Sequence, residues 1–146
     1  MSNLSQIRTD SFIKRLVDEW LAYGKIIIGL DFDDTISPWK FTEPEWFRDT
    51  IDAVKEAQKE GAFVVIFTAC DPDRHDEIRD RCAKMKLTIN SINENPINLP
   101  YGNHKKIYAN IYLDDRAGLD NAIYILRAAI YWIRGMRANK NLDDVA

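Results

Sequence analysis

Residues 26–35, with the sequence IIIGLDFDDT, are the stretch from which the fold of this chain can be worked out. They open with a continuous apolar run and end with three carboxylates, Asp31, Asp33 and Asp34, and the hydroxyl of Thr35. A short apolar run without alternation is typical of a strand that is buried on both faces, as in a parallel sheet. The acids would then lie at the carboxyl end of that strand, where open α/β sheets bind their ligands.

The first two of these acids are expected to act together. Alternation along a strand points Asp31 and Asp33 in the same direction. Two carboxylates about 4 Å apart repel each other by about 1 kcal/mol in water and by roughly 4 kcal/mol at an effective dielectric near 20. A cation would relieve that repulsion, and ligands that are all oxygen suit Mg²⁺. Taken alone, the same motif also fits a solvated acidic turn.

Length and composition favour one domain, residues 1–146, with a core of ordinary size. The net charge of −3 provides no broad basic field for DNA or RNA. The first residues lack the pattern of a signal peptide, and no apolar run is long enough to span a membrane. Cys70 and Cys82 form neither a CxxC motif nor a metal-ligand cluster, so we expect reduced thiols in a cytoplasmic protein with no membrane partner.

Helical and strand patterns alternate along the chain. Thr42-x-x-Glu45 resembles a capping box with Pro44 in the first turn, and Gly61 is expected to end the helix that follows. This order predicts right-handed crossovers and a three-layer α/β/α, Rossmann-like fold with a mainly parallel sheet. The expected elements are an N-terminal helix (10–23), strands (25–32, 62–67, 87–92 and 107–113), helices from about 42 and 71, and a C-terminal helix (119–137).

Polar residues follow three of the four expected strands. Because the carboxyl ends of parallel strands share one edge of a sheet, residues far apart in sequence would meet in one crevice there. The candidates are Asp31 and Asp33 after the first strand, Thr68 after the second, and Asp114 with Asp115 after the fourth.

These signals together resemble the motifs of the haloacid dehalogenase-like (HAD) superfamily of phosphohydrolases, over roughly residues 25–118. The resemblance implies that Asp31 is a nucleophile, Asp33 a general acid/base and Thr68 a ligand of the phosphoryl group. It also implies a Mg²⁺ site formed by Asp31, the backbone carbonyl of Asp33, Asp114 and Asp115. The sequence YANIYLDD, residues 108–115, is locally similar to 5′(3′)-deoxyribonucleotidases.

The third motif of that superfamily is a lone Lys that binds phosphate, and here it would be Lys106 or Lys105. Only about eight residues separate Lys106 from Asp114, so a strand throughout at ~3.3 Å per residue would carry the Lys to the wrong end of the sheet. A helical turn before a short strand would bring it back. His104, Arg74 and Lys40 are further candidates.

The chemistry follows from what phosphoryl transfer needs: an in-line nucleophile, compensation of charge on the phosphoryl oxygens, and a proton for the leaving group. We therefore predict a Mg²⁺-dependent phosphatase that acts through an aspartyl phosphate on Asp31. The chain has no room for a large cap domain, so the site would be open. Its substrate would be a phosphorylated molecule such as a nucleotide, a sugar phosphate or a nucleic-acid end.

Several alternatives stay open at this stage. The scaffold could serve a non-catalytic phosphate-binding protein, a phosphotransferase, or a receiver-type signalling module. Among single residues, Thr35 could be a turn hydroxyl, Asp34 a solvated neighbour, Thr68 a strand-end cap, and Asp115 the ion-pair partner of Arg116.

The C-terminal helix predicts a contact of its own. One apolar stripe, which includes Leu126, can pack on the sheet, but Tyr124, Ile125, Tyr131 and Trp132 lie off it. Either the N-terminal helix or a second subunit would cover them. We accordingly consider a homodimer whose interface uses Tyr124, Tyr131 or Trp132.

Overall fold

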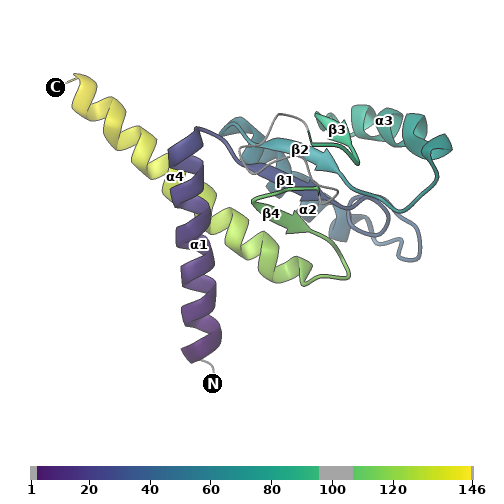
Figure 1. Ribbon diagram of the computed structural model, residues 1–146, viewed down its shortest axis with the longest axis horizontal. Coiled ribbons are helices and arrows are strands. Elements are labelled where there is room, and N and C mark those ends of the chain that lie inside the picture. Colours follow the sequence, from purple (N-terminus) through teal and green to yellow (C-terminus); the bar gives the residue numbers. More distant parts are fainter. Residues whose placement is uncertain (1–2, 96–106, 146) are drawn as a thin grey trace.

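The computed structural model describes residues 3–95 and 107–145 of the chain (Figure 1). The sheet has four strands in the order β3-β2-β1-β4, and all neighbouring strands are parallel. The elements are α1 (Asn3–Tyr23), β1 (Ile27–Leu30), α2 (Pro44–Lys59), β2 (Phe63–Ile66), the 3₁₀ turn η1 (Pro72–Arg74), α3 (His75–Lys84), β3 (Ser91–Ile92), β4 (Ile111–Leu113) and α4 (Leu119–Val145). The predicted α/β class is confirmed: a parallel sheet is flanked by helices, and the described residues contain no cap domain.

The strand β1 is buried along its whole length between β2 and β4, as its unbroken apolar run predicts. Gly29 lies where the neighbouring strand approaches too closely for a side chain. A Cβ built there would lie 2.7 Å from the ring of Tyr112 and 3.2 Å from the Cβ of Ala109. The glycine in the apolar run therefore makes room for β4 and its aromatic residue.

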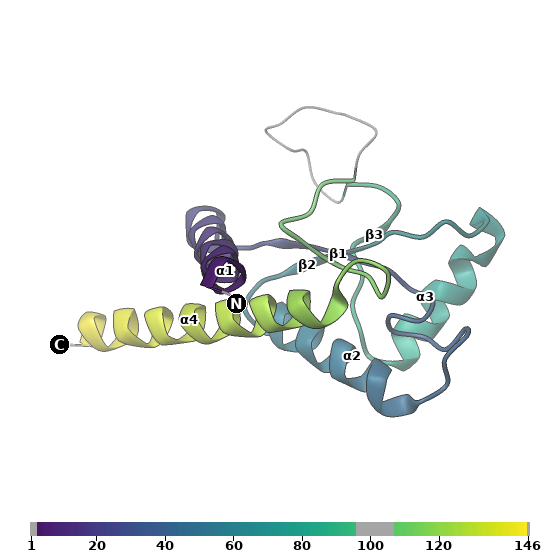
Figure 2. The ribbon, with the colours of Figure 1, turned by 90° about the horizontal axis from the view of Figure 1, so that it is seen from below.

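The two faces of the sheet are covered differently. Figure 2 shows α2, α3 and α4 on one side of the strands, with α1 seen nearly end-on beside α4. The large core cluster belongs to that side and joins Ile28 and Leu30 of β1 to residues of all four helices. A smaller cluster, built around Ile27, Val65 and Ala109, lies on the other face and is covered by the segment that leads into β4.

The helices α1 and α4 pack against each other, and α4 continues well beyond the sheet (Figure 1). Trp20 of α1 is fully buried, and its indole N–H donates to the backbone oxygen of Glu60 at 2.9 Å. Arg137 of α4 donates to the same oxygen at 3.0 Å. The end of α2 thus anchors both of the long helices.

Several predicted element bounds were wrong. The helix α1 begins at Asn3 rather than at residue 10, and α4 continues to Val145 rather than ending near 137. Both additions are mainly polar, so they carry no apolar stripe, yet no proline interrupts them. The capping box predicted for α2 does not form, because Glu43 is the N-cap and makes no side-chain cap bond. Pro44 in the first turn of α2 and Gly61 after its last turn, with φ +98°, are as expected.

The strands β3 and β4 are shorter than predicted, and asparagines mark where they begin. The side-chain oxygen of Asn90 accepts the N–H of Val64 at 2.8 Å, and that of Asn110 accepts the N–H of Ile27 at 2.7 Å. In both cases a side-chain amide replaces a backbone carbonyl at the start of the ladder. In both cases the polar residue inside the predicted strand directly precedes the first residue of the observed strand.

The aromatic residues on α4 are only partly accounted for. Ile125 is buried in the same cluster as Leu16 and Trp20 of α1, whereas Tyr124, Tyr131 and Trp132 are exposed. The homodimer stays a prediction. No helix in residues 3–95 or 107–145 is long and apolar enough to cross a bilayer.

Candidate functional site: an acidic cluster at the carboxyl end of the sheet

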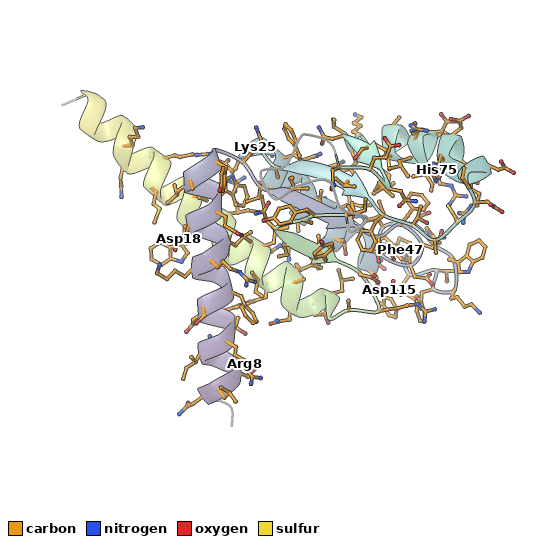
Figure 3. The ribbon with its side chains drawn as sticks, in the orientation of Figure 1. Arg8, Asp18, Lys25, Phe47, His75 and Asp115 are labelled. Carbon is orange, nitrogen blue, oxygen red and sulfur yellow. The ribbon has the colours of Figure 1, made fainter. Side chains whose placement is uncertain are left out.

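The register of the sheet brings two of the predicted acids together. Leu30 of β1 pairs with Leu113 of β4, and the N–H of Asp31 donates to the oxygen of Leu113 at 2.9 Å. Asp31 and Asp114 directly follow these paired residues, so the parallel ladder makes them neighbours. Figure 3 shows Asp115 at this carboxyl end of the sheet, whereas Lys25, which precedes β1, lies at the opposite end.

Asp31, Asp114 and Asp115 form one cluster. A carboxylate oxygen from each lies within 4.8 Å of those of the other two, and all three residues are half-buried. All their ligand atoms are oxygen, which is the donor set of hard divalent cations. This cluster is a candidate metal site.

Thr35 links two members of the cluster, Asp31 and Asp115, through hydrogen bonds. Its hydroxyl oxygen accepts the backbone N–H of Asp115 at 3.0 Å and lies 2.9 Å from an oxygen of Asp31 and 3.1 Å from one of Asp115. Its single proton can serve either carboxylate. With 1% of its surface exposed, Thr35 is an interior crosslink between β1 and β4 rather than a turn hydroxyl.

The electrostatics of the cluster fit a cation. Burial raises the pKa of Asp31 to about 7; the hydrogen bond from Thr35 opposes the rise, and the charges of Asp114 and Asp115 add to it. Asp31 resists ionisation because it is buried beside two other carboxylates. A divalent ion would offset the negative charge of all three groups and so favour the ionised form of Asp31. The residues present therefore fit a metal ion.

Asp33 has different partners. Its side chain does not belong to the cluster, and its two oxygens accept hydrogen bonds from Nη1 and Nη2 of Arg74 at 3.0 and 3.2 Å. This is the bidentate fork that guanidinium groups form with planar anions. Arg74 comes from η1, which follows β2, so the second acid of the motif turns toward α3 rather than toward β4.

Asp34 shapes the loop that follows β1. One of its oxygens accepts the backbone N–H groups of Trp39, Lys40 and Phe41 at 3.0, 2.8 and 3.0 Å. Desolvation acts against the charged form, but these three bonds prevail and lower the pKa of the Asp34 carboxyl below its usual value. Asp34, at φ 62°, is thus a structural residue rather than a solvated neighbour of the site.

Thr68 follows β2 on the other side of β1. Its hydroxyl oxygen accepts the N–H of Cys70 at 3.2 Å, as in a strand-end cap. Its backbone is held on both sides by the side-chain amide of Asn93, at 2.8 and 2.9 Å. Since the hydroxyl accepts in that bond, its proton is still available for a further acceptor.

An open hollow adjoins the acidic cluster. It has a volume of about 680 Å³ and its walls include Thr35, Phe41, Trp46, Asp115 and Ile123. Phe41, Trp46 and the nearby Trp39 are exposed, at 48%, 56% and 64% of their surfaces. Phe41, from the loop that Asp34 organises, and Trp46, from α2, therefore lie beside the site without closing it.

The sequence predictions for the site had mixed outcomes. The sheet brings Asp31, Asp114 and Asp115 together, and Asp33 lies beside Arg74 instead. The phosphate-binding candidates Lys105, Lys106 and His104 lie outside the described residues.

Comparisons with known proteins add a likeness of fold. No protein-family model matches the sequence, and the search of curated proteins gave no match. A solved structure from Bacteroides thetaiotaomicron, described as a conserved protein coded by a locus, is similar with a TM-score of 0.53 and 22% identity. The match covers 63% of this chain and 77% of the other. At that identity the similarity supports the α/β fold alone.

Proposed function

We propose that this protein is a Mg²⁺-dependent phosphomonoester hydrolase that acts through an aspartyl phosphate on Asp31. The observation that carries the proposal is the acidic cluster, with oxygens of Asp31, Asp114 and Asp115 within 4.8 Å of one another at the carboxyl end of a parallel sheet. The order of the motifs along the chain, which resembles that of the HAD superfamily, supports the same reaction class.

Asp31, Asp114 and Asp115 are the residues that would hold the ion. When bound, Mg²⁺ would offset negative charge on both the carboxylates and a phosphoryl group. The side chain of Asp33 is engaged by Arg74, so we assign it no metal role of its own. Any contribution of Asp33 to the metal would come from its backbone carbonyl, as the resemblance implies.

The chain's own residues supply the rest of the chemistry. A carboxylate oxygen of Asp31 attacks phosphorus, the bond from phosphorus to the ester oxygen breaks, and Asp33 in its acid form gives its proton to the leaving oxygen. Asp33 then removes a proton from water, the water oxygen attacks phosphorus, and the bond to Asp31 breaks. Phosphate leaves and both carboxyl groups return to their starting state.

The phosphoryl oxygens also need hydrogen-bond donors. The free hydroxyl proton of Thr68 suits this role, because its oxygen is already fixed by the N–H of Cys70. Lys106 or Lys105 would supply a positive charge, in keeping with the superfamily's third motif. The open site suits a large phosphorylated metabolite, a nucleotide or a nucleic-acid end, and we propose that the protein acts in the cytoplasm.

Phosphate release from a panel of phosphomonoesters tests the proposal. We expect turnover with Mg²⁺, none after thorough chelation, and none for Asp31→Asn under either condition. Undiminished turnover after chelation would contradict the metal-dependent mechanism. Stable phosphorylation of Asp31 without release of phosphate would favour the phosphotransfer or signalling alternative, and phosphate binding without any turnover would favour a non-catalytic phosphate-binding protein.

A further inference from the structure

The bidentate pair between Arg74 and Asp33 lies at the carboxyl end of β1, where the proposed function places the substrate. Among the described residues, no other Lys or Arg side chain forms an ion pair with Asp31, Asp33, Asp114 or Asp115. The side chains of both partners are 26% exposed, so the pair is open to solvent from one side. An incoming anion can therefore reach the guanidinium without any rearrangement of the core.

Distances place that guanidinium within reach of a bound phosphoryl group. For Asp33 to exchange a proton with an ester oxygen, the two oxygens must approach to about 2.6–3.2 Å. The guanidinium nitrogens already lie 3.0 and 3.2 Å from the oxygens of Asp33. The ester oxygen would thus lie within about 6.4 Å of the Nη atoms of Arg74, so a rotation of the flexible arginine side chain can bring the guanidinium to the phosphoryl group.

The other edges of Arg74 are held independently of Asp33. Its Nε lies 3.6 Å from Glu77, and its guanidinium carbon lies 5.2 Å from the ring centre of Trp39. Glu77 is paired in turn with Arg81 at 2.9 Å, and Arg81 donates to Ser37 at 2.8 Å. If the bonds to Asp33 were given up, Glu77 and Trp39 would keep the Nη edge directed at the site.

Charge decides whether Arg74 binds the carboxylate of Asp33 or the phosphoryl group of the substrate. A phosphate dianion attracts a cation about twice as strongly as a carboxylate at the same distance, and its oxygens match the same bidentate geometry. We infer that Arg74 is a phosphate-binding residue that exchanges Asp33 for the substrate's phosphoryl group, and so frees Asp33 as the substrate binds. This inference rests on the proposed function, and it assigns to Arg74 a role beyond the Lys of the resemblance.

Binding of inorganic phosphate in the presence of Mg²⁺, measured by calorimetry on the full chain, tests the exchange. We expect Arg74→Ala to weaken phosphate binding at least tenfold. Arg74→Lys, which keeps the charge but not the fork, is expected to lose a smaller factor. Arg79→Ala is the matched control, because it removes the same charge from α3 at an exposed position paired with Asp76, and it should stay within twofold of wild type.

A second substitution separates exchange from mere bracing of the loop. Asp33→Asn removes the anion that competes for Arg74, so phosphate affinity should rise, and most of the rise should vanish in the Arg74→Ala background. A brace would predict unchanged or weaker binding in Asp33→Asn. In turnover, Arg74→Ala should raise KM by a larger factor than it lowers kcat, because the lost contact is already made in the bound ground state.

The outcomes distinguish this inference from the proposed function. If wild type hydrolyses esters and binds phosphate while Arg74→Ala binds it within twofold, the exchange is wrong and the phosphatase stands. If wild type with Mg²⁺ neither hydrolyses any ester nor binds phosphate, both are wrong. Thermal melting of each variant shows whether it is folded. If Arg74→Ala does not fold, phosphate binding by Arg74→Lys still tests the exchange.

Discussion

The two sides of the carboxyl end of β1 treat chemically identical side chains in opposite ways. On the side of β4, Asp31 lies among other acids, and its pKa is raised to about 7, first by burial. On the side of α3, Asp33 lies in the fork of Arg74. Asp31 and Asp33 are separated by one residue just after β1, yet one carboxyl group lies in a site that lacks a cation and the other is paired with one.

This difference suggests a division of labour. The acidic side, made of Asp31, Asp114 and Asp115, has the ligands for a cation. The other side, which we call the basic side, presents the guanidinium of Arg74, held by Trp39 and Glu77, and we propose that it binds an anion. A metal-assisted phosphoryl transfer needs both, because the metal and the phosphoryl group must meet at the nucleophile. Altering one side and measuring the response of the other tests this division.

The largest effect is expected from the acidic side. Asp31→Asn replaces the proposed nucleophile by an amide, which cannot form the acyl phosphate, and we expect turnover to fall more than about 1000-fold, or ~4 kcal/mol in barrier. Phosphate-release kinetics measure this. Asp76→Asn, on the fully exposed surface of α3, is the control and should keep wild-type activity. Turnover within tenfold of wild type would show that Asp31 is not the nucleophile.

Asp33→Asn alters the other side. We expect kcat to fall by roughly 100-fold, within the range for loss of a general acid/base. Mg²⁺ affinity, measured calorimetrically, should change by less than about threefold, because the carboxylate of Asp33 lies outside the acidic cluster. Loss of Mg²⁺ binding in this variant would mean that the two sides are not separable.

The raised pKa of Asp31 predicts how metal binding depends on pH. Because the ligand must be ionised, Mg²⁺ affinity should fall by up to about tenfold per pH unit below the pKa of about 7. Calorimetric titrations at a series of pH values measure this slope. Affinity that is flat between pH 5.5 and pH 7 would contradict the raised pKa.

Stability should respond with the opposite sign. The pKa of Asp31 in the folded protein lies above its ordinary value of 3.8, so folding favours the protonated carboxyl group. The stabilisation from this protonated group is complete below pH 3.8 and is lost as the pH rises through about 7. The metal-free protein should therefore melt lower near pH 8 than near pH 5.5, once the same difference in Asp31→Asn is subtracted. Mg²⁺ should raise the melting temperature more near pH 8 than near pH 5.5.

The smallest effect is expected from the crosslink beneath the cluster. Thr35→Val keeps the shape of the side chain but removes the acceptor of the Asp115 N–H and the donor to Asp31. We expect a loss of about 1–3 kcal/mol in unfolding free energy and a drop in Mg²⁺ affinity of about tenfold, at the low end of the range for groups that support metal ligands. Thr35→Ser retains the hydroxyl and should recover most of both. Equal losses in the two variants would point to packing rather than the hydrogen bonds.

The sequence was informative about the acidic side because that side depends on strand register. Buried strands reveal themselves by their apolar runs, and in a parallel sheet the residues after paired strand ends must be neighbours. Asp31 and Asp114 could therefore be brought together from the sequence with no knowledge of side-chain contacts. Thr35 was harder, because a hydroxyl four residues after an acid has no periodicity that distinguishes a crosslink from a turn.

The basic side was beyond what the sequence could predict. Arg74 was one of several candidate cations, and the pairing of its fork with Asp33 depends on where η1 begins and how its rotamer fits between Trp39 and Glu77. The role of Asp34 was missed for the same reason, since its three bonds reach backbone groups five to seven residues away in an irregular loop.

By itself the sequence determined that this protein has a parallel α/β fold and that acids gather at the carboxyl end of its sheet, because hydrophobic burial follows a period that can be read along the chain. Tertiary structure alone decided which charged groups lie next to each carboxylate. Asp31 and Asp33 share a residue type and a strand end, and their environments differ only through elements that pack beside them from elsewhere in the chain: β4 for one and η1 for the other. Electrostatic interactions depend on distance and burial in three dimensions, and neither quantity can be read from the spacing of residues along the sequence.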